Sequence, residues 1–134
     1  MPSHATGTFD VNLQPMPLAD TDAGPLMGRL SINKTFSGGL QATSKGEMLS
    51  ATTAVKGSAG YVAMERVTGT LNGKSGSFVL QHSGTMNRGV PQLTVSVVPD
   101  SGTDELIGLT GTLSIQIEGG KHSYAMDYEI SPRE

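Results

Sequence analysis

The chain has 134 residues, a net charge of −3 and no cysteine, and glycine, serine and threonine together supply about a third of it. This length suits a single domain spanning residues 1–134, and the lack of cysteine excludes disulfides, thiolate zinc sites and a cysteine nucleophile. The nine Lys and Arg residues are scattered and no apolar run approaches the ~18 residues of a membrane span, so we expect neither a nucleic acid nor a membrane as partner.

The first half of the chain alternates apolar and polar residues, which is typical of β-strands. Three prolines and a glycine predict a loop over residues 15–25, and Gly46 predicts a bulge within its strand. Small residues over 50–60 fit either a strand or a loop. The strands predicted in this half cover residues 9–13, 30–36 and 40–48.

The second half begins with the strongest turn signal in the sequence. Asn72-Gly73 predicts a tight hairpin, because both residues tolerate the positive φ that a type I′ turn requires. Residues 101–108 fit a single helical turn capped by Thr103 or Asp104. Further turns are predicted at 87–89 and 119–120. The strands predicted here cover residues 61–71, 74–86, 93–97, 113–117 and 124–130.

About eight strands joined largely by short turns predict an all-β protein with an antiparallel meander, because parallel strands need long crossovers. Each strand has one apolar face. Eight such strands can close into a barrel, which removes exposed sheet edges. An antiparallel closed eight-stranded barrel is therefore the expected fold, and a two-sheet β-sandwich is the alternative.

A short motif, hydroxyl–Gly–Thr followed by a large apolar residue, occurs four times. Its glycine shares the apolar face, two residues before the large side chain. Such glycines allow a curved sheet to bend, or they leave a cavity inside it. The four glycines are Gly7, Gly69, Gly84 and Gly111.

Three polar residues lie on apolar faces near the predicted hairpin. A two-residue turn pairs Ala63 with His82, which makes Glu65 and His82 diagonal neighbours and places Tyr61 one pair further on. A carboxylate beside an imidazole has the make-up of a general acid/base site. A structural His–Glu pair is the alternative interpretation, and a one-residue bulge would turn Glu65 into solvent.

The last predicted strand adds Tyr124 and Tyr128 to the same face, with His122 on the same parity. Aromatic rows of this kind form core packing, or they present polar tips to a ligand. The six internal methionines likewise fill gaps in a core or line an adaptable pocket. The candidate ligand-binding residues are thus His82, Glu65, Tyr61, Tyr124 and Tyr128.

No enzyme motif is present: the sequence has no P-loop, no G-x-G-x-x-G and no H-E-x-x-H. The three histidines lack metal-ligand spacing, so we expect no metal and no cofactor. The first residues lack the basic and apolar regions of a secretory signal, which favours a cytoplasmic protein. Whether the protein is an enzyme stays open at this point.

Two stretches, 69–84 and 98–111, resemble a family of small uncharacterised bacterial proteins catalogued as a domain of unknown function, and the likeness extends over nearly the whole chain. Members resemble the allene-oxide-cyclase-like barrel. The second stretch is also similar to the G-T-G-x-F-x-x-A-x-G segment of plant allene oxide cyclases, with Asp104, Leu106 and Leu109 in place of its second Gly, its Phe and its Ala. The resemblance implies a barrel and no particular activity.

Three functions are compatible with these observations. The first is a barrel that binds a small apolar molecule. The second is a cofactor-free isomerase or cyclase, with His82 and Glu65 as acid/base pair and Tyr61 as orienting residue. The third is an oligomeric structural protein whose barrel is filled with side chains. An outward apolar patch of Val62, Met64, Val79 and Val98 predicts a homodimer.

Overall fold

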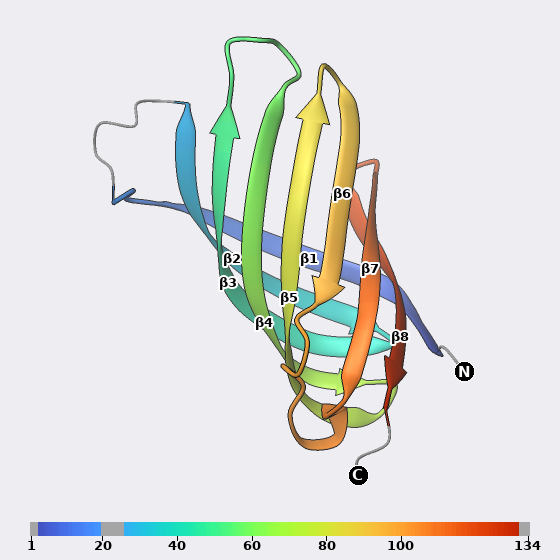
Figure 1. Cartoon of the computed structure of the whole chain (residues 1–134). Coiled ribbons are helices and arrows are strands. Elements are labelled where there is room, and N and C mark those ends of the chain that lie inside the picture. Colours follow the sequence, from blue (N-terminus) through green and yellow to red (C-terminus); the bar gives the residue numbers. More distant parts are fainter. Residues whose placement is uncertain (1–2, 20–25, 132–134) are drawn as a thin grey trace.

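The computed structural model describes residues 3–19 and 26–131 and contains eight antiparallel strands in a closed barrel, in the order β1 to β8. The predicted barrel is therefore confirmed and the β-sandwich is excluded. In Figure 1 the turns after β3, β5 and β7 lie at the upper end, and both termini lie towards the lower end. The strands are β1 (Ser3–Met16), β2 (Met27–Gly38), β3 (Leu40–Thr52), β4 (Ala59–Leu71), β5 (Lys74–Asn87), β6 (Val90–Val97), β7 (Leu109–Glu118) and β8 (Lys121–Ile130).

The Asn72-Gly73 hairpin has the predicted register. Asn72 and Gly73 have φ values of 47° and 86°, as a type I′ turn requires, and Leu71 pairs with Lys74. Counting back from this pair, Ala63 lies opposite His82 and Glu65 lies opposite Leu80. The turn chemistry of two residues thus fixes which side chains of β4 and β5 are neighbours.

Two details predicted for the first half are wrong. β1 ends among the prolines, as expected, but it includes the first two residues of the predicted loop: Pro15 pairs with Leu30 of β2, and Met16 is the last residue of the strand. Beyond Phe9, β1 no longer pairs with β8, and a proline is tolerated at such a free edge. Residues 20–25 of the predicted loop lie outside the described residues. Gly46 forms no bulge, because its register runs without interruption against both β2 and β4.

The undecided stretch and the predicted helical turn are also resolved. β3 extends to Thr52, and β4 begins at Ala59. One turn of 3-10 helix, η1, spans Asp104–Leu106 between β6 and β7. Thr103 is at its N-cap position but makes no capping bond. Its hydroxyl instead accepts a hydrogen bond from the backbone N–H of Ser77 at 2.9 Å.

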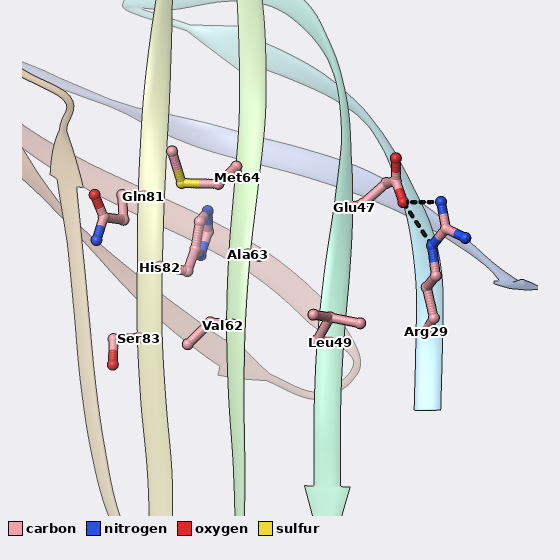
Figure 2. A pocket seen from close by; sticks show the side chains of 9 residues that line it. All are labelled: Arg29, Glu47, Leu49, Val62, Ala63, Met64, Gln81, His82 and Ser83. Carbon is pink, nitrogen blue, oxygen red and sulfur yellow. Dashed lines mark hydrogen bonds and ion pairs between the residues drawn. The ribbon is translucent and has the colours of Figure 1, made fainter. Parts of the chain in front are cut away.

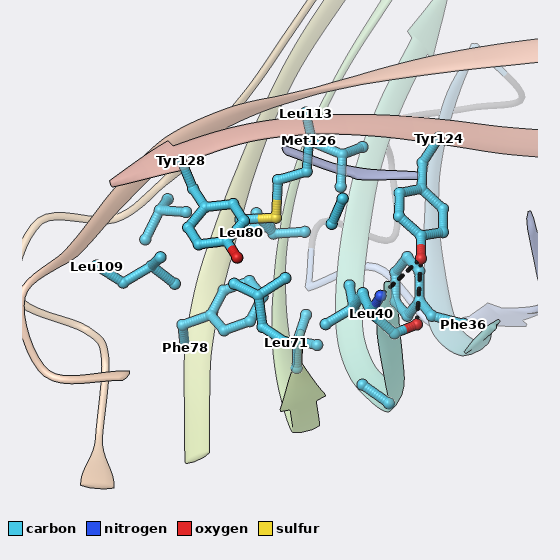
Figure 3. Packing of buried hydrophobic residues seen from close by; sticks show 14 of the residues in the cluster. Phe36, Leu40, Leu71, Phe78, Leu80, Leu109, Leu113, Tyr124, Met126 and Tyr128 are labelled. Carbon is cyan, nitrogen blue, oxygen red and sulfur yellow. Dashed lines mark hydrogen bonds between the residues drawn. The ribbon is translucent and has the colours of Figure 1, made fainter. Parts of the chain in front are cut away.

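The lower half of the barrel is filled by apolar side chains from all eight strands and from η1. Figure 3 shows this packing, with Leu71, Phe78 and Leu80 facing Met126 across the interior. Phe78, Leu80 and Met126 are at most 1% exposed. The apolar alternation read from the sequence therefore corresponds to this core, in which Leu106 of η1 helps to seal the lower end.

The four motif glycines serve two purposes. A Cβ at Gly111 would come within 2.4 Å of the backbone oxygen of Asp127, and Gly7 and Gly69 meet neighbouring backbone in the same way. These three glycines allow close approach of adjacent strands in a tightly curved sheet. A Cβ at Gly84 would instead meet the ring of Tyr61 at 2.5 Å, so this glycine makes room for an aromatic side chain.

Candidate functional site

A buried polar cluster lies in the middle of the barrel, directly above the apolar core. It consists of Lys34, Ser44, Glu65 and His82, which are 8%, 3%, 1% and 3% exposed. Glu65 is at its centre. One carboxylate oxygen, Oε1, accepts from Lys34 Nζ at 2.9 Å and from His82 Nε2 at 2.6 Å, and the other, Oε2, accepts from the hydroxyl of Ser44 at 2.6 Å.

Four adjacent strands supply these side chains. Lys34 on β2 pairs with Ser44 on β3, and Glu65 on β4 has His82 of β5 as its diagonal neighbour. The residue directly opposite Glu65 on β3 is Gly46. A Cβ there would lie 2.9 Å from the Cβ of Glu65 and 2.1 Å from the backbone oxygen of Met64, so only glycine fits beside the buried carboxylate.

The cluster keeps Glu65 ionised. Burial alone raises the pKa of a carboxyl group, but the His82 hydrogen bond, the positive charge of Lys34 and the Ser44 hydroxyl outweigh burial and lower the pKa of Glu65 from 4.5 to about 2. An ionised carboxylate only accepts hydrogen bonds, so Nε2 of His82 carries the proton in their shared bond. In the neutral ring the other nitrogen, Nδ1, is then an acceptor.

An inner cavity of about 190 Å³ lies beside the polar cluster within the barrel. Lys34 and His82 form its polar side, and the rest of its wall is mostly apolar. A second cavity of about 470 Å³, the mouth cavity, lies at the upper end and shares four lining residues with the first, namely Met48, Tyr61, Leu93 and Ile117. The apolar residues of the inner cavity are Phe9, Val11, Leu13, Ile32, Met48, Ala63, Leu93, Ile115 and Ile117.

Tyr61 stands between the two cavities, where it lines both of them. Its ring centroid is 6.3 Å from that of His82. Burial, and to a smaller extent the negative charge of Glu65, raises the pKa of Tyr61 above its ordinary value, so the hydroxyl keeps its proton at neutral pH. Tyr61 is thus a neutral hydrogen-bonding group on the cavity wall, next to the polar cluster rather than part of it.

The structure brings Glu65, His82 and Tyr61 together, as predicted, but it places Tyr124 and Tyr128 elsewhere. Tyr124 donates its hydroxyl hydrogen to Ser37 O at 2.8 Å. The same hydroxyl accepts from Leu40 N at 2.9 Å (Figure 3). The hydroxyl of Tyr128 accepts from the side chain of Asn72 at 2.6 Å. Both rings belong to the apolar core, and neither is among the described residues that line the inner cavity.

The residues that sequence reasoning missed are Lys34 and Ser44. Both share strand parity with buried apolar residues such as Phe36 and Ala42, and this was the signal that could have found them. A charged residue is almost never fully buried unless it is paired, so a lysine on an apolar face calls for a buried acid. His122 of β8 also lines the inner cavity, 5.2 Å from Phe9 between ring centroids.

A separate outer groove of about 500 Å³ lies on the opposite face of β3, β4 and β5. Figure 2 shows Leu49, Val62 and Met64 along it, with the ion pair of Arg29 and Glu47 at one side. Leu49, Val62 and Met64 are about half exposed. Ala63 and His82 also contribute to the wall of this groove, although their strand parity places their side chains on the inner face of the sheet.

Comparison with known proteins identifies the family of the chain. The family model DUF3224, which describes proteins of unknown function, matches residues 5–128. The chain belongs to this family. A crystal structure of a DUF3224 protein of unknown function from Shewanella oneidensis MR-1 is 51% identical, has a TM-score of 0.94, and covers 99% of this chain and 100% of that chain. No curated protein matches the chain.

The bacterial family resemblance read from the sequence is thus confirmed, whereas no comparison tests the likeness to allene oxide cyclases. Over residues 3–19 and 26–131, no group of three or more His, Cys, Asp and Glu side chains is arranged to hold a metal ion. The same ranges include no helix with the length and hydropathy needed to cross a membrane.

Proposed function

We propose that this DUF3224 protein binds one small, mostly apolar molecule inside the upper half of its barrel. The observation that carries the proposal is a set of large apolar side chains that face inward yet stay exposed. Leu13, Met86, Leu93 and Ile117 are between 41% and 63% exposed, although they lie on the inner face of their strands. Exposed apolar surface of this kind, gathered in a concave site, is typical of a ligand-binding cavity.

The size of the inner cavity supports an occupant of about one ring. An apolar cavity of about 150 Å³ in another protein accommodates benzene, and the inner cavity here has about 190 Å³. The mouth cavity continues it towards solvent and gives a path of entry. An empty space of this size beside polar groups favours binding over the alternative of a barrel filled for structural purposes.

Substitution at the junction of the two cavities tests the proposal. Leu93→Trp adds bulk where the inner and mouth cavities meet, whereas Thr94→Trp adds the same ring to the outer face of β6. A neutral fluorescent probe, N-phenyl-1-naphthylamine, is large enough to occupy both cavities, with its phenyl ring in the inner one and its naphthyl group in the mouth cavity. We expect it to bind the unmodified protein and to bind Leu93→Trp at least about tenfold more weakly. Thr94→Trp is the matched control and keeps the affinity. Absence of probe binding, or equal weakening in both variants, contradicts the proposal.

Proton-transfer catalysis in the same cavity is a second candidate function. It is favoured by the Glu65–His82 pair, because a neutral imidazole that donates Nε2–H to a carboxylate has a basic Nδ1. His82 would then remove a proton from a carbon next to a carbonyl group. We expect the protein to accelerate hydrogen–deuterium exchange at the α-carbons of phenylacetone, followed by NMR, and His82→Gln to abolish the acceleration. An unmodified protein that exchanges no faster than buffer excludes this candidate.

A further inference from the structure

The polar cluster contains two basic side chains and one acid. Lys34 Nζ and His82 Nε2 both donate to the same oxygen, Oε1 of Glu65, at 2.9 and 2.6 Å. Oε2 is engaged by a neutral hydroxyl, that of Ser44. With Lys34 and Glu65 both ionised, the cluster has no net charge while His82 is neutral. If His82 were protonated, the cluster would carry one positive charge without a negative partner.

Lys34 also has donor capacity left over. An ammonium group has three N–H bonds, and among the described residues the only hydrogen-bond acceptor of Lys34 Nζ is Glu65. The rest of its surroundings are aromatic, with Phe9 at 4.9 Å and Phe36 at 5.8 Å from Nζ to the ring centroids. Lys34 and His82 both line the inner cavity, so a molecule bound there lies against both bases.

We propose that the occupant of the inner cavity is a monocarboxylic acid with a compact apolar body. This inference rests on the proposed function and adds the class of ligand. The carboxylate accepts hydrogen bonds from Lys34 Nζ, and His82 takes up one proton at Nδ1 and becomes an imidazolium. The two bases then face two carboxylates, that of Glu65 and that of the ligand, and the buried charges balance.

Charge and size exclude other classes. A cationic ligand would meet the ammonium group of Lys34 without a free acid to pair with. A dianion such as a phosphate monoester would leave one buried negative charge uncompensated, which is costly in an apolar site. A neutral alcohol of the same shape can bind, but its hydrogen bond with Lys34 lacks the attraction between opposite charges, and its binding needs no proton.

Proton uptake is the signature of this arrangement. The titratable or charged groups that face His82 are Glu65 and Tyr61 on β4 and Lys34 on β2, and His122 on β8 faces the same cavity. Glu65 stays ionised and Tyr61 stays protonated near neutral pH, so the two histidines are the groups that can accept a proton there. Of the two histidines, His82 belongs to the same polar cluster as Lys34, so a carboxylate held by Lys34 lies beside His82, where we expect the proton to be bound.

Calorimetric titration with phenylacetate and with 2-phenylethanol tests the proposal. Each titration is run near neutral pH in Hepes and in Tris, whose different ionisation enthalpies reveal protons exchanged with the buffer. We expect phenylacetate to bind more tightly than 2-phenylethanol and to take up a substantial fraction of one proton, whereas the alcohol takes up none. His82→Gln should abolish the uptake, and His4→Gln, at an exposed histidine of β1 that does not line the cavity, should preserve it.

Lys34 is tested by two variants. Lys34→Met should weaken phenylacetate by about ten- to a hundredfold, as expected for loss of a hydrogen bond to a charged group, and should weaken 2-phenylethanol far less. Because Lys34→Met leaves Glu65 with a buried charge and can prevent folding, the double variant Lys34→Met/Glu65→Gln removes both charges together. This double variant should still bind 2-phenylethanol, but it should no longer bind phenylacetate more tightly than the alcohol.

The possible failures are distinguishable. If 2-phenylethanol binds as tightly as phenylacetate, or phenylacetate binds without proton uptake, the ligand class is wrong and cavity binding stands. The same conclusion follows if neither compound binds while N-phenyl-1-naphthylamine still binds and Leu93→Trp still blocks it. If the neutral probe also fails to bind, the proposed function itself is wrong and the ligand class falls with it.

Discussion

The ionised side chain of Glu65 is stabilised in the interior because several hydrogen-bond donors surround its carboxylate. Its carboxylate receives three hydrogen bonds, from Lys34, Ser44 and His82, each from a different strand. An unpaired buried charge would be expelled or neutralised. Here the partners more than offset burial, so the pKa of Glu65 falls to about 2. The carboxylate therefore holds β2, β3, β4 and β5 together at mid-height in the barrel.

The acid stability of the protein should depend on Glu65. Its pKa is about 2 in the folded chain and 4.5 without the fold, so the stabilisation is complete well above pH 4.5 and is lost as pH falls from about 4.5 to about 2. The difference corresponds to roughly 3 kcal/mol at neutral pH. Urea denaturation across this pH range should show the free energy of unfolding decreasing more steeply in the unmodified protein than in Glu65→Gln.

At neutral pH, Glu65→Gln should itself lower the free energy of unfolding by roughly 3–5 kcal/mol, because Lys34 loses its buried counter-charge. Glu47→Gln is the matched control, since Glu47 pairs with Arg29 on the exposed outer face. It should change stability by less than about 1 kcal/mol. Identical pH profiles for the unmodified protein and Glu65→Gln would contradict a structural role of the carboxylate.

At the scale of strands, β3 and β4 lie close together where Gly46 faces Glu65. The register is continuous there, so the glycine is required by proximity and not by a bulge. A Cβ added at Gly60, at the upper end of β4, would lie 3.7 Å from its nearest neighbouring atom, which is an ordinary van der Waals contact. These two glycines form a natural pair for comparison, because both lie within paired strands.

Gly46→Ala should be strongly destabilising and Gly60→Ala nearly neutral. The new methyl group at residue 46 would lie 2.1 Å from the backbone oxygen of Met64, which forces β3 and β4 apart and disturbs Glu65. We expect a loss of about 3 kcal/mol or more in the free energy of unfolding, within the range of overpacking and broken polar networks. Thermal denaturation of both variants measures this. Equal changes in the free energy of unfolding for the two variants would contradict a special need for glycine at residue 46.

For the whole molecule, the two ends of the barrel differ. The lower end is closed by the apolar core and η1, and the upper end carries the inner and mouth cavities. The outer surface is also uneven. Val62 and Met64 are 52% and 49% exposed next to Leu49, whereas Val79 and Val98 are half-buried. The apolar outer patch predicted from parity is therefore centred on β3 and β4.

The homodimer stays a prediction, and this patch is where we expect its interface. In a two-fold dimer the same surface faces itself, so Arg29 of one copy can pair with Glu47 of the other beside the apolar contact. Val62→Lys combined with Met64→Lys should dissociate the dimer, measured by sedimentation equilibrium at about tens of micromolar protein. Val90→Lys, at an exposed valine on β6 outside the patch, is the control. A 13.9 kDa species for the unmodified chain contradicts the dimer.

Local chemistry made much of the barrel predictable. Alternation placed the strands, because side chains of a strand alternate between two faces. Asn72-Gly73 fixed the register of β4 and β5, because a two-residue turn leaves one way to pair the strands that it joins. The contact between Glu65 and His82 follows from that register alone, so half of the polar cluster could be predicted. The predicted loop at Pro15 and the predicted bulge at Gly46 were wrong because both depend on neighbours across the sheet, which the local sequence does not specify.

By itself the sequence determined which face of each strand is apolar, where the chain turns and that Glu65 meets His82. Only the tertiary structure decided that Lys34 and Ser44 join them, since Lys34 reaches Glu65 across two strand boundaries and through the curvature of the closed barrel. It also decided that Tyr124 and Tyr128 pack in the core while Tyr61 faces a cavity. Parity assigns a side chain to the interior, but its height along the barrel and the closure of the sheet determine what it touches there.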